Sequence, residues 1–257
     1  MRFELHIALR YLLARPKQAF ISVISLISTL GVAVGVMALV IALALTTGLQ
    51  GEMRDRLLGA MAHVYVWKTY GIDDYQEEVQ KLREVDGVVG VGPAIPGSAF
   101  ITTAEGEELI KIKGVDPVLE PGVTDVKTTL VSGSLEGLSG SDGVPGVLLG
   151  RMLAQKLGVE VGDPVNLITS QSVSLTPFTP PIPRSREARV AGIFSLGMLE
   201  FDSQWAFMSL DFAAQLMGQD SAQLFQLKVA DADAAPEIAR RITAELGTEY
   251  VADDWQQ

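Results

Sequence analysis

The feature that most constrains this chain is an uncharged stretch that runs from Gln18 to Gly51. Its apolar part, from Ala19 to Leu49, reads AFISVISLISTLGVAVGVMALVIALALTTGL. A helix needs about 20 apolar residues to cross the hydrocarbon core of a bilayer, so this stretch is long enough to span a membrane. It is too long for the apolar region of a cleaved signal peptide, and core helices of soluble proteins rarely stay uncharged over such a length. The sequence therefore predicts a transmembrane helix over residues 19–49 that continues outward to about residue 61.

Charged residues are distributed unequally on the two sides of this stretch. Four basic residues and one acidic residue precede it, a net charge of +3, whereas 16 basic and 30 acidic residues follow it, a net charge of −14. Basic residues beside a membrane helix stay on the cytoplasmic side. We therefore expect residues 1–18 to form a cytoplasmic amphipathic segment and residues 62–257 to form a periplasmic domain, in a bacterial inner membrane.

The predicted membrane helix has two distinguishable faces. Small residues recur at spacings of three and four, which places them on one stripe where another helix can approach closely. The small residues are Ser28, Gly31, Gly35, Ala38 and Ala42, and the bulkier residues that lie mostly on another face are Val23, Leu30, Val34, Met37, Ile41 and Leu45. Because Ala and Gly are frequent in membrane helices, chance is one explanation of the stripe. The other is that this helix packs against further helices.

The rest of the chain alternates between short apolar runs and helical segments. The predicted strands are 63–67, 88–91, 98–103, 109–115, 147–150, 164–169, 188–194, 205–209 and 224–229, and the predicted helices are 73–85, 151–157, 210–217 and 235–246. Asp73 is the expected N-cap of the first of these helices, Gly87 is its stop signal, and the Gly-, Ser- and Asp-rich segment 124–146 is expected to be a loop. Strands mixed with helices in no regular βαβ repeat predict an α+β fold.

One predicted loop is unusual in composition. Residues 170–186 read SQSVSLTPFTPPIPRSR, with four prolines between two predicted strands. Proline cannot donate a hydrogen bond to a sheet and favours an extended path, so we expect a stiff projection and not a packed strand. A solvated linker loop is the alternative. An extended segment that carries apolar and basic side chains is suited to binding another protein.

Sequence motifs for catalysis are absent from the chain. No GxxxxGK[ST] phosphate-binding loop occurs, and two histidines without any cysteine exclude a His/Cys metal site. We therefore expect no enzymatic activity, no metal and no cofactor. His63 is expected to be a packed or hydrogen-bonded side chain, and the acidic pairs Asp73-Asp74 and Asp253-Asp254 are expected to be solvated.

Two segments resemble a known family. Residues 10–64 closely resemble the opening of the permease subunits of the lipoprotein-releasing (Lol) ABC transporter, in the run FISVISLIS, the pair Gly31 and Gly35, the step Gly48-Leu49-Gln50 and the closing Ala62-His63-Val64. Residues 147–169 are similar to the periplasmic core domain that Lol permeases share with macrolide-exporter (MacB) and division-type (FtsX) permeases. The first segment is specific to the Lol family, and the second indicates the superfamily only.

The resemblance implies a MacB-like periplasmic core domain after the first of four membrane helices. It also implies partners: a cytoplasmic ATPase subunit of the LolD type, a second permease subunit that is the same or related, a lipoprotein substrate held in membrane lipid, and a soluble periplasmic lipoprotein carrier of the LolA type. No nucleic acid is implied. The bulky helix face with Val34, Met37, Ile41 and Leu45 would then contact acyl chains, and the small stripe would pack against neighbouring helices.

In this family, the subunit that receives the carrier has a proline-bounded hook followed by a polar and basic pad. By resemblance, Thr176-Pro177 and Ile182-Pro183 bound the hook, Phe178 is its apolar contact, and Arg184, Ser185 and Arg186 form the pad. The preceding strand departs from the pattern, because Asn166 and Leu167 stand where a further basic residue is expected. The expected carrier-docking residues are Thr176, Pro177, Phe178, Ile182, Pro183, Arg184 and Arg186.

The chain stops at Asp254-Trp255-Gln256-Gln257, where the family enters its second membrane helix. We therefore expect a piece of a longer permease. Two alternatives stay open. One is a permease of the same superfamily that serves export or division signalling, although the proline-rich hook counts against it. The other is a single-span scaffold whose periplasmic domain only binds a partner.

Overall fold

The computed structural model describes residues 19–69, 72, 74–140, 142–173, 182–219 and 221–255, together with residues 3, 4, 6, 7 and 10. The chain divides into two compact units, Met1–Asp55 and Arg56–Gln257.

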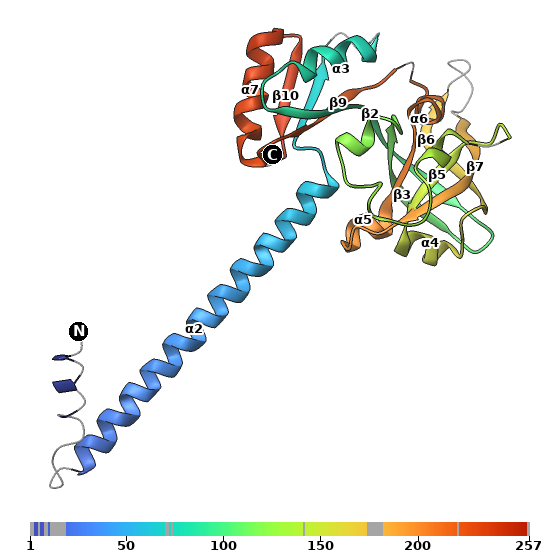
Figure 1. The fold of residues 1–257 in the computed structure, drawn as a ribbon. Helices are drawn as coiled ribbons and strands as arrows, with labels where there is room; N and C mark the ends of the chain where they lie inside the picture. Colours follow the sequence, from blue (N-terminus) through green and yellow to red (C-terminus); the bar gives the residue numbers. More distant parts are fainter. Residues whose placement is uncertain are drawn as a thin grey trace. The chain divides into compact units, whose positions relative to one another are not determined.

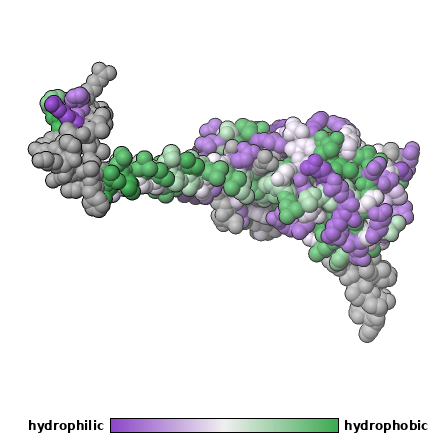
Figure 2. Space-filling view, turned by 90° about the horizontal axis from the view of Figure 1, so that it is seen from below, coloured by the Kyte–Doolittle hydropathy of each residue, from purple (hydrophilic) through white to green (hydrophobic). Residues whose placement is uncertain are grey.

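The first unit is dominated by the helix α2 (Ala19–Ala60), whose last residues belong to the second unit. Every side chain from residue 23 to residue 54 is exposed, and Figure 2 shows a mainly apolar surface along this helix. The Val23–Ala60 part is long and apolar enough to cross a membrane. The hydroxyls of Thr29 and Thr46 donate to the carbonyls of Ser25 and Ala42, at 2.7 Å and 2.9 Å, so these two polar groups are satisfied within the helix. The prediction of one long apolar helix is confirmed.

Half of the second unit has the order of elements β-α-β-β-α-β, as in ferredoxin-like folds (Figure 1). Its strands are antiparallel and lie in the order β10-β1-β9-β2. The elements are β1 (Val64–Lys68), α3 (Tyr75–Arg83), β2 (Val88–Thr102), β9 (Leu224–Val229), α7 (Ala235–Leu246) and β10 (Tyr250–Asp254). The sheet and both helices share one apolar core, which includes Val66, Leu82, Phe225 and Ile242.

The other half is a closed ring of six strands in which each strand pairs with the next and the last returns to the first. In ring order these are β2, β3 (Glu107–Val115), β8 (Trp205–Ser209), β5 (Gly146–Gly150), β7 (Ile182–Phe194) and β6 (Pro164–Val173). All six strands contribute to a second apolar core, which also takes in residues of α4 (Arg151–Leu157) and α6 (Leu210–Met217). In Figure 1, α4 and α6 lie near opposite ends of this barrel.

Shorter elements complete the barrel half. They are η2 (Glu120–Gly122), β4 (Leu130–Gly133), η3 (Glu136–Ser139) and α5 (Leu199–Gln204), and η4 (Ala232–Ala234) precedes α7 in the other half. Leu135, Leu138, Phe194 and Phe207 belong to a third apolar cluster. The α+β prediction is confirmed by this arrangement.

Strand β2 connects the two halves, because its first part pairs with β9 and its last part pairs with β6. The sequence analysis predicted two separate strands here, 88–91 and 98–103, and that prediction is wrong, because one strand continues through Pro93 and Pro96. The Ala94 carbonyl accepts from Gln223 N at 3.1 Å, so by alternation the nitrogen of Pro96 points to the side where β9 has ended and β6 has not begun. The nitrogen of Pro93 points to the opposite side, where the pairing with β3 has ended at Ala94. Neither proline therefore removes a hydrogen bond from an adjacent strand.

Three local features differ from those that the sequence predicts. The N-cap of α3 is Asp74, whose carboxylate accepts from the backbone N–H groups of Gln76 and Glu77, and not the predicted Asp73, which lies outside the described residues. The pair Asp253-Asp254 is not a solvated tail but part of β10, which pairs with β1. The predicted loop 124–146 contains β4, which pairs with β7. Both missed strands are only four and five residues long, and each pairs with a strand that is distant in sequence.

Candidate functional site

The segment expected to dock a partner lies between β6 and β7. These strands pair antiparallel beyond the barrel, with Ser172 opposite Pro183 and Val173 opposite Ile182 after a register shift between Thr169 and Ser172. The predicted loop over residues 170–186 is therefore wrong at both ends, which are strands. The register shift explains how Pro183 is accommodated, because a bulge interrupts the ladder at that point. Residues 174–181, which include Thr176, Pro177 and Phe178, lie outside the described residues, as do the side chains of Ile182 and Pro183.

Arg184 is held against the end of helix α6. Its Nη1 donates to the backbone carbonyl of Gln215 at 3.2 Å, and its side chain is half-buried. The guanidinium also lies over Gly218, where a Cβ atom would meet Arg184 Nη1 at 2.2 Å. Gly218 has a φ of 69° and ends α6 in the left-handed conformation. A cation at the negative end of the helix dipole is stabilising, so Arg184 anchors the base of the hairpin to α6.

The side chains of Arg186 and Ser185 are both exposed, and they project from opposite faces of the sheet. Arg186 lies opposite the buried Leu167. Among the described residues, its only hydrogen bond runs from Nη1 to the carbonyl of its neighbour Ser185, at 3.3 Å. Ser185 points outward from the barrel, where its hydroxyl donates to Asn166 Oδ1 at 2.8 Å. Asn166, which departed from the expected basic pattern, thus orients a pad residue. Of the two arginines, Arg186 is the one left available to a partner.

No role was predicted for Gly218 and Gln215, which contact Arg184. A glycine directly after an apolar helical run is a recognised helix stop. What the sequence could not indicate is that the hairpin base, more than thirty residues earlier, would pack on this helix end.

The two predicted faces of α2 lie side by side along the helix. At 3.6 residues per turn, the small set and the set Val34, Met37, Ile41 and Leu45 each cover an arc of about 80°, and the two arcs adjoin. All of these side chains are exposed. A Cβ atom added at Gly31 or Gly35 would meet no atom within 4 Å. The roles in acyl-chain contact and helix packing stay predictions.

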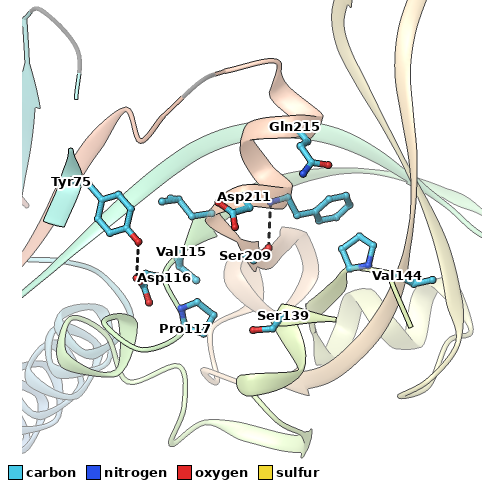
Figure 3. A pocket seen from close by; sticks show the side chains of 13 residues that line it. Tyr75, Val115, Asp116, Pro117, Ser139, Val144, Ser209, Asp211 and Gln215 are labelled. Carbon is cyan, nitrogen blue, oxygen red and sulfur yellow. Dashed lines mark hydrogen bonds between the residues drawn. The ribbon is translucent and has the colours of Figure 1, made fainter. Parts of the chain in front are cut away.

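A cavity of about 400 Å³ lies between α3, the end of β3 and the start of α6 (Figure 3). Tyr75 Oη donates to Asp116 Oδ2 across it at 3.3 Å. Burial, and then the charge of Asp116, raise the pKa of Tyr75. The other polar groups serve local structure: Asp116 Oδ1 accepts from Val118 N at 2.8 Å, and Ser209 Oγ caps α6 by accepting from Phe212 N at 3.3 Å. This cavity lies between the two halves of the domain. Among the described residues that line it, no serine nucleophile is hydrogen-bonded to a base.

His63 is packed and hydrogen-bonded, as predicted. Its side chain is buried, Nδ1 lies 3.3 Å from Val229 N and 3.2 Å from the Val229 carbonyl, and Nε2 lies 3.2 Å from the Leu58 carbonyl. Burial lowers the pKa of His63, which favours the neutral ring. The residue ties the end of α2 to β9 and plays no chemical role that these contacts support.

Comparison with known proteins places the chain in a family. Residues 25–245 match the family of MacB-like periplasmic core domains. The chain is 34% identical over 250 residues to the lipoprotein-releasing system transmembrane protein LolC of Xylella fastidiosa (strain 9a5c), which covers 97% of this chain and 59% of that protein. It is 29% identical to LolC of Neisseria meningitidis serogroup B (strain MC58), over 98% of this chain and 60% of that protein.

Two more distant similarities were found. LolE of Haemophilus influenzae (strain KW20 / Rd) is 24% identical over 88% of this chain and 52% of that protein. The solved periplasmic region of MacB from Actinobacillus actinomycetemcomitans is 13% identical, with a TM-score of 0.48, over 77% of this chain and 90% of that structure. The chain thus spans about three fifths of the length of the LolC proteins that it matches. On the match of residues 25–245, which begins within the long apolar helix α2, the chain belongs to the family of MacB-like periplasmic core domains.

Proposed function

We propose that this chain is part of a permease subunit of an ABC transporter that releases lipoproteins from the inner membrane and passes them to a soluble periplasmic carrier. The observation that carries the proposal is the similarity to LolC over 97% of the chain, because it takes in both the apolar helix and the periplasmic core domain. The LolC and LolE relatives favour this function over the exporter and scaffold alternatives.

In this proposal α2 crosses the inner membrane with its N-terminus in the cytoplasm, and the second unit lies in the periplasm. The excess of basic residues before the uncharged stretch supports that orientation. The energy comes from a partner ATPase subunit of the LolD type, since this sequence has no phosphate-binding loop. A second permease subunit completes the transporter.

Extraction is energetically demanding because acyl chains are stabilised in the bilayer by about 0.8 kcal/mol per buried CH₂ group. A helix face that is as apolar as lipid lowers the cost of moving a chain out of the bilayer. We assign that role to Val34, Met37, Ile41 and Leu45. The adjoining stripe of small residues would let a neighbouring helix approach α2 closely beside the acyl chains.

The hairpin between β6 and β7 is the proposed docking site for the carrier. Arg184 would act as a positioning residue, because its guanidinium is engaged with the end of α6. Arg186 would contact the carrier directly, because its side chain is exposed and bonds only to its neighbour's carbonyl among the described residues. A charge at the rim of an interface guides association and specificity, so an acidic group on the carrier is the expected partner of Arg186.

A crosslinking experiment tests this function. A photoreactive amino acid at Phe178 of the membrane-inserted permease is expected to crosslink to the purified periplasmic carrier of the same organism. Arg186→Glu should abolish the crosslink. Arg151→Glu is the matched control, because Arg151 is exposed at the start of α4, where an acidic residue suits the helix dipole. A folded, inserted permease that gives no crosslink would contradict the docking role.

A further inference from the structure

The outer face of the barrel carries an apolar row that runs across three neighbouring strands and ends at a serine on a fourth. The strand registers place Leu109 opposite Phe100, Phe100 opposite Ile168, and Ile168 opposite Ser185. Directly paired residues in antiparallel strands project from the same face. None of these four residues belongs to the apolar core inside the barrel. The row therefore lies on the outside, and at about 4.8 Å between strands it extends roughly 14 Å.

This row is open to solvent. Leu109 is 58% exposed and Phe100 is 37% exposed, and Ile168 is half-buried beside them. Isolated exposed apolar residues are normal on protein surfaces, but three in register on adjacent strands form a continuous strip.

Polar rows flank the strip on both sides. Glu107, Thr102, Asn166 and Glu187 form the row on one side, and Lys111 and Ser98 form the row on the other. An apolar centre within a polar rim is the usual composition of a protein–protein interface, in which aromatic side chains are enriched. The strip is too narrow, and too closely bordered by charge, to suit a lipid surface.

The strip meets the proposed docking site at Ser185. Ser185 is the pad residue that projects outward, where Asn166 orients its hydroxyl, whereas Arg184 is engaged with α6. The described part of the pad thus continues onto the outer face of β6, and from there through Ile168 to Phe100 and Leu109.

We propose that the carrier-docking surface extends from the hairpin base across the outer faces of β6, β2 and β3, with Phe100 and Leu109 at its apolar centre. This inference rests on the proposed function. The occupant is the lipoprotein carrier, and it would present an apolar patch to the strip together with an acidic group within reach of Arg186.

Binding of the purified carrier to the complete permease in lipid nanodiscs tests the proposal. Phe100→Ser and Leu109→Ser are expected to raise the dissociation constant about fivefold each, and the double variant more than tenfold, because each removes a side chain from a desolvated interface centre. Val89→Ser is the matched control: Val89 is 60% exposed on the same strand β2 but outside the strip, so its replacement should leave the affinity unchanged.

Photocrosslinking gives a second test that does not rely on loss of binding in a variant. A photoreactive amino acid at Leu109 should crosslink to the carrier, and one at Val89 should not. If the Phe100 and Leu109 variants bind as tightly as the wild type while Arg186→Glu loses affinity, the extended surface is wrong and the proposed docking function stands. If the wild type does not bind the carrier, both are wrong. If both the Arg186 variant and the strip variants lose affinity, both are supported.

Discussion

At the residue scale, Arg184 and Gly218 show how a single contact joins two elements that are distant in sequence. Gly218 has a left-handed backbone, and the Arg184 guanidinium occupies the space that a side chain at this position would need. Left-handed backbone costs an L-residue about 1–2 kcal/mol, before any clash is counted. The contact therefore depends on glycine for both conformation and space.

Gly218→Ala is expected to lower the free energy of unfolding by about 2 kcal/mol, because it adds backbone strain and displaces Arg184. Urea denaturation of the detergent-solubilised chain, followed by tryptophan fluorescence, measures the effect. Gly106→Ala is the control, because a Cβ atom there meets nothing within 4 Å. Equal effects of the two substitutions would show that the contact with Arg184 is unimportant.

The surroundings of Glu78 predict how the stability of the protein depends on pH. Its burial, the largest single influence, raises the pKa, but hydrogen bonds from Tyr250 and Lys68 and the charge of Lys68 outweigh it, so the pKa of Glu78 lies below its usual 4.5. A carboxyl group with a lowered pKa in the folded state contributes stability that is fully present above the unfolded-state value. That contribution is lost as the pH falls from about 4.5 through the lowered folded-state value.

Glu78→Gln should therefore destabilise the protein at pH 7 and flatten the loss of stability below pH 4.5. Urea denaturation of both proteins at a series of pH values from 3 to 7 measures this. If the free energy of unfolding changed with pH in the same way for the wild type and Glu78→Gln, the lowered pKa would be contradicted. Glu78 would then have the same pKa in the folded and unfolded states.

At the element scale, most helices and strands follow from local sequence, and the exceptions share a cause. The helix α6 and the strand β9 occur at their predicted bounds, 210–217 and 224–229, because apolar spacing and a glycine stop determine them locally. Strand β2 was predicted as two strands, and the hairpin ends were predicted as a proline-rich loop. Pro93 and Pro96 lie where no neighbouring strand needs their missing N–H group, and Pro183 follows a register shift, and only the pairing of distant strands shows where those places are.

The helix α2 carries a prediction at this scale about the small-residue stripe. Gly35→Leu is expected to reduce the yield of assembled transporter, because it blocks the close approach of a neighbouring helix. Val36→Leu is the control, since Val36 is exposed on a different side of the helix from the stripe. Co-purification of the partner ATPase and permease subunits measures assembly. A normal yield for Gly35→Leu would assign the stripe to chance.

At the scale of the whole molecule, β2 holds the periplasmic domain together. Its first part contributes Val91 to the ferredoxin-like core, and its second part contributes Ile95, Ala99 and Ile101 to the barrel core. One continuous strand therefore takes part in both cores. This arrangement suits the proposed docking of a carrier on the barrel.

Closure of the barrel could not be predicted from the sequence. It depends on two parallel pairings, β3 with β8 and β5 with β7, between strands that are far apart in the chain. The alternation of residues in each strand indicates a buried face but not its partner. The motif resemblance predicts a docking segment at residues 176–186, whereas the difference between the engaged Arg184 and the exposed Arg186 is seen only in the packing of the hairpin base on α6.

The most direct test of the account is ATP-driven release of a lipoprotein from proteoliposomes that contain the complete permease with its partner subunits. The measured quantity is lipoprotein bound to the soluble carrier. The account predicts release that requires both ATP and carrier, that falls at least about tenfold in Arg186→Glu while ATP hydrolysis persists, and that is unchanged in Arg151→Glu. Release by Arg186→Glu at the wild-type rate, or a wild-type transporter that releases no lipoprotein to the carrier, would contradict it.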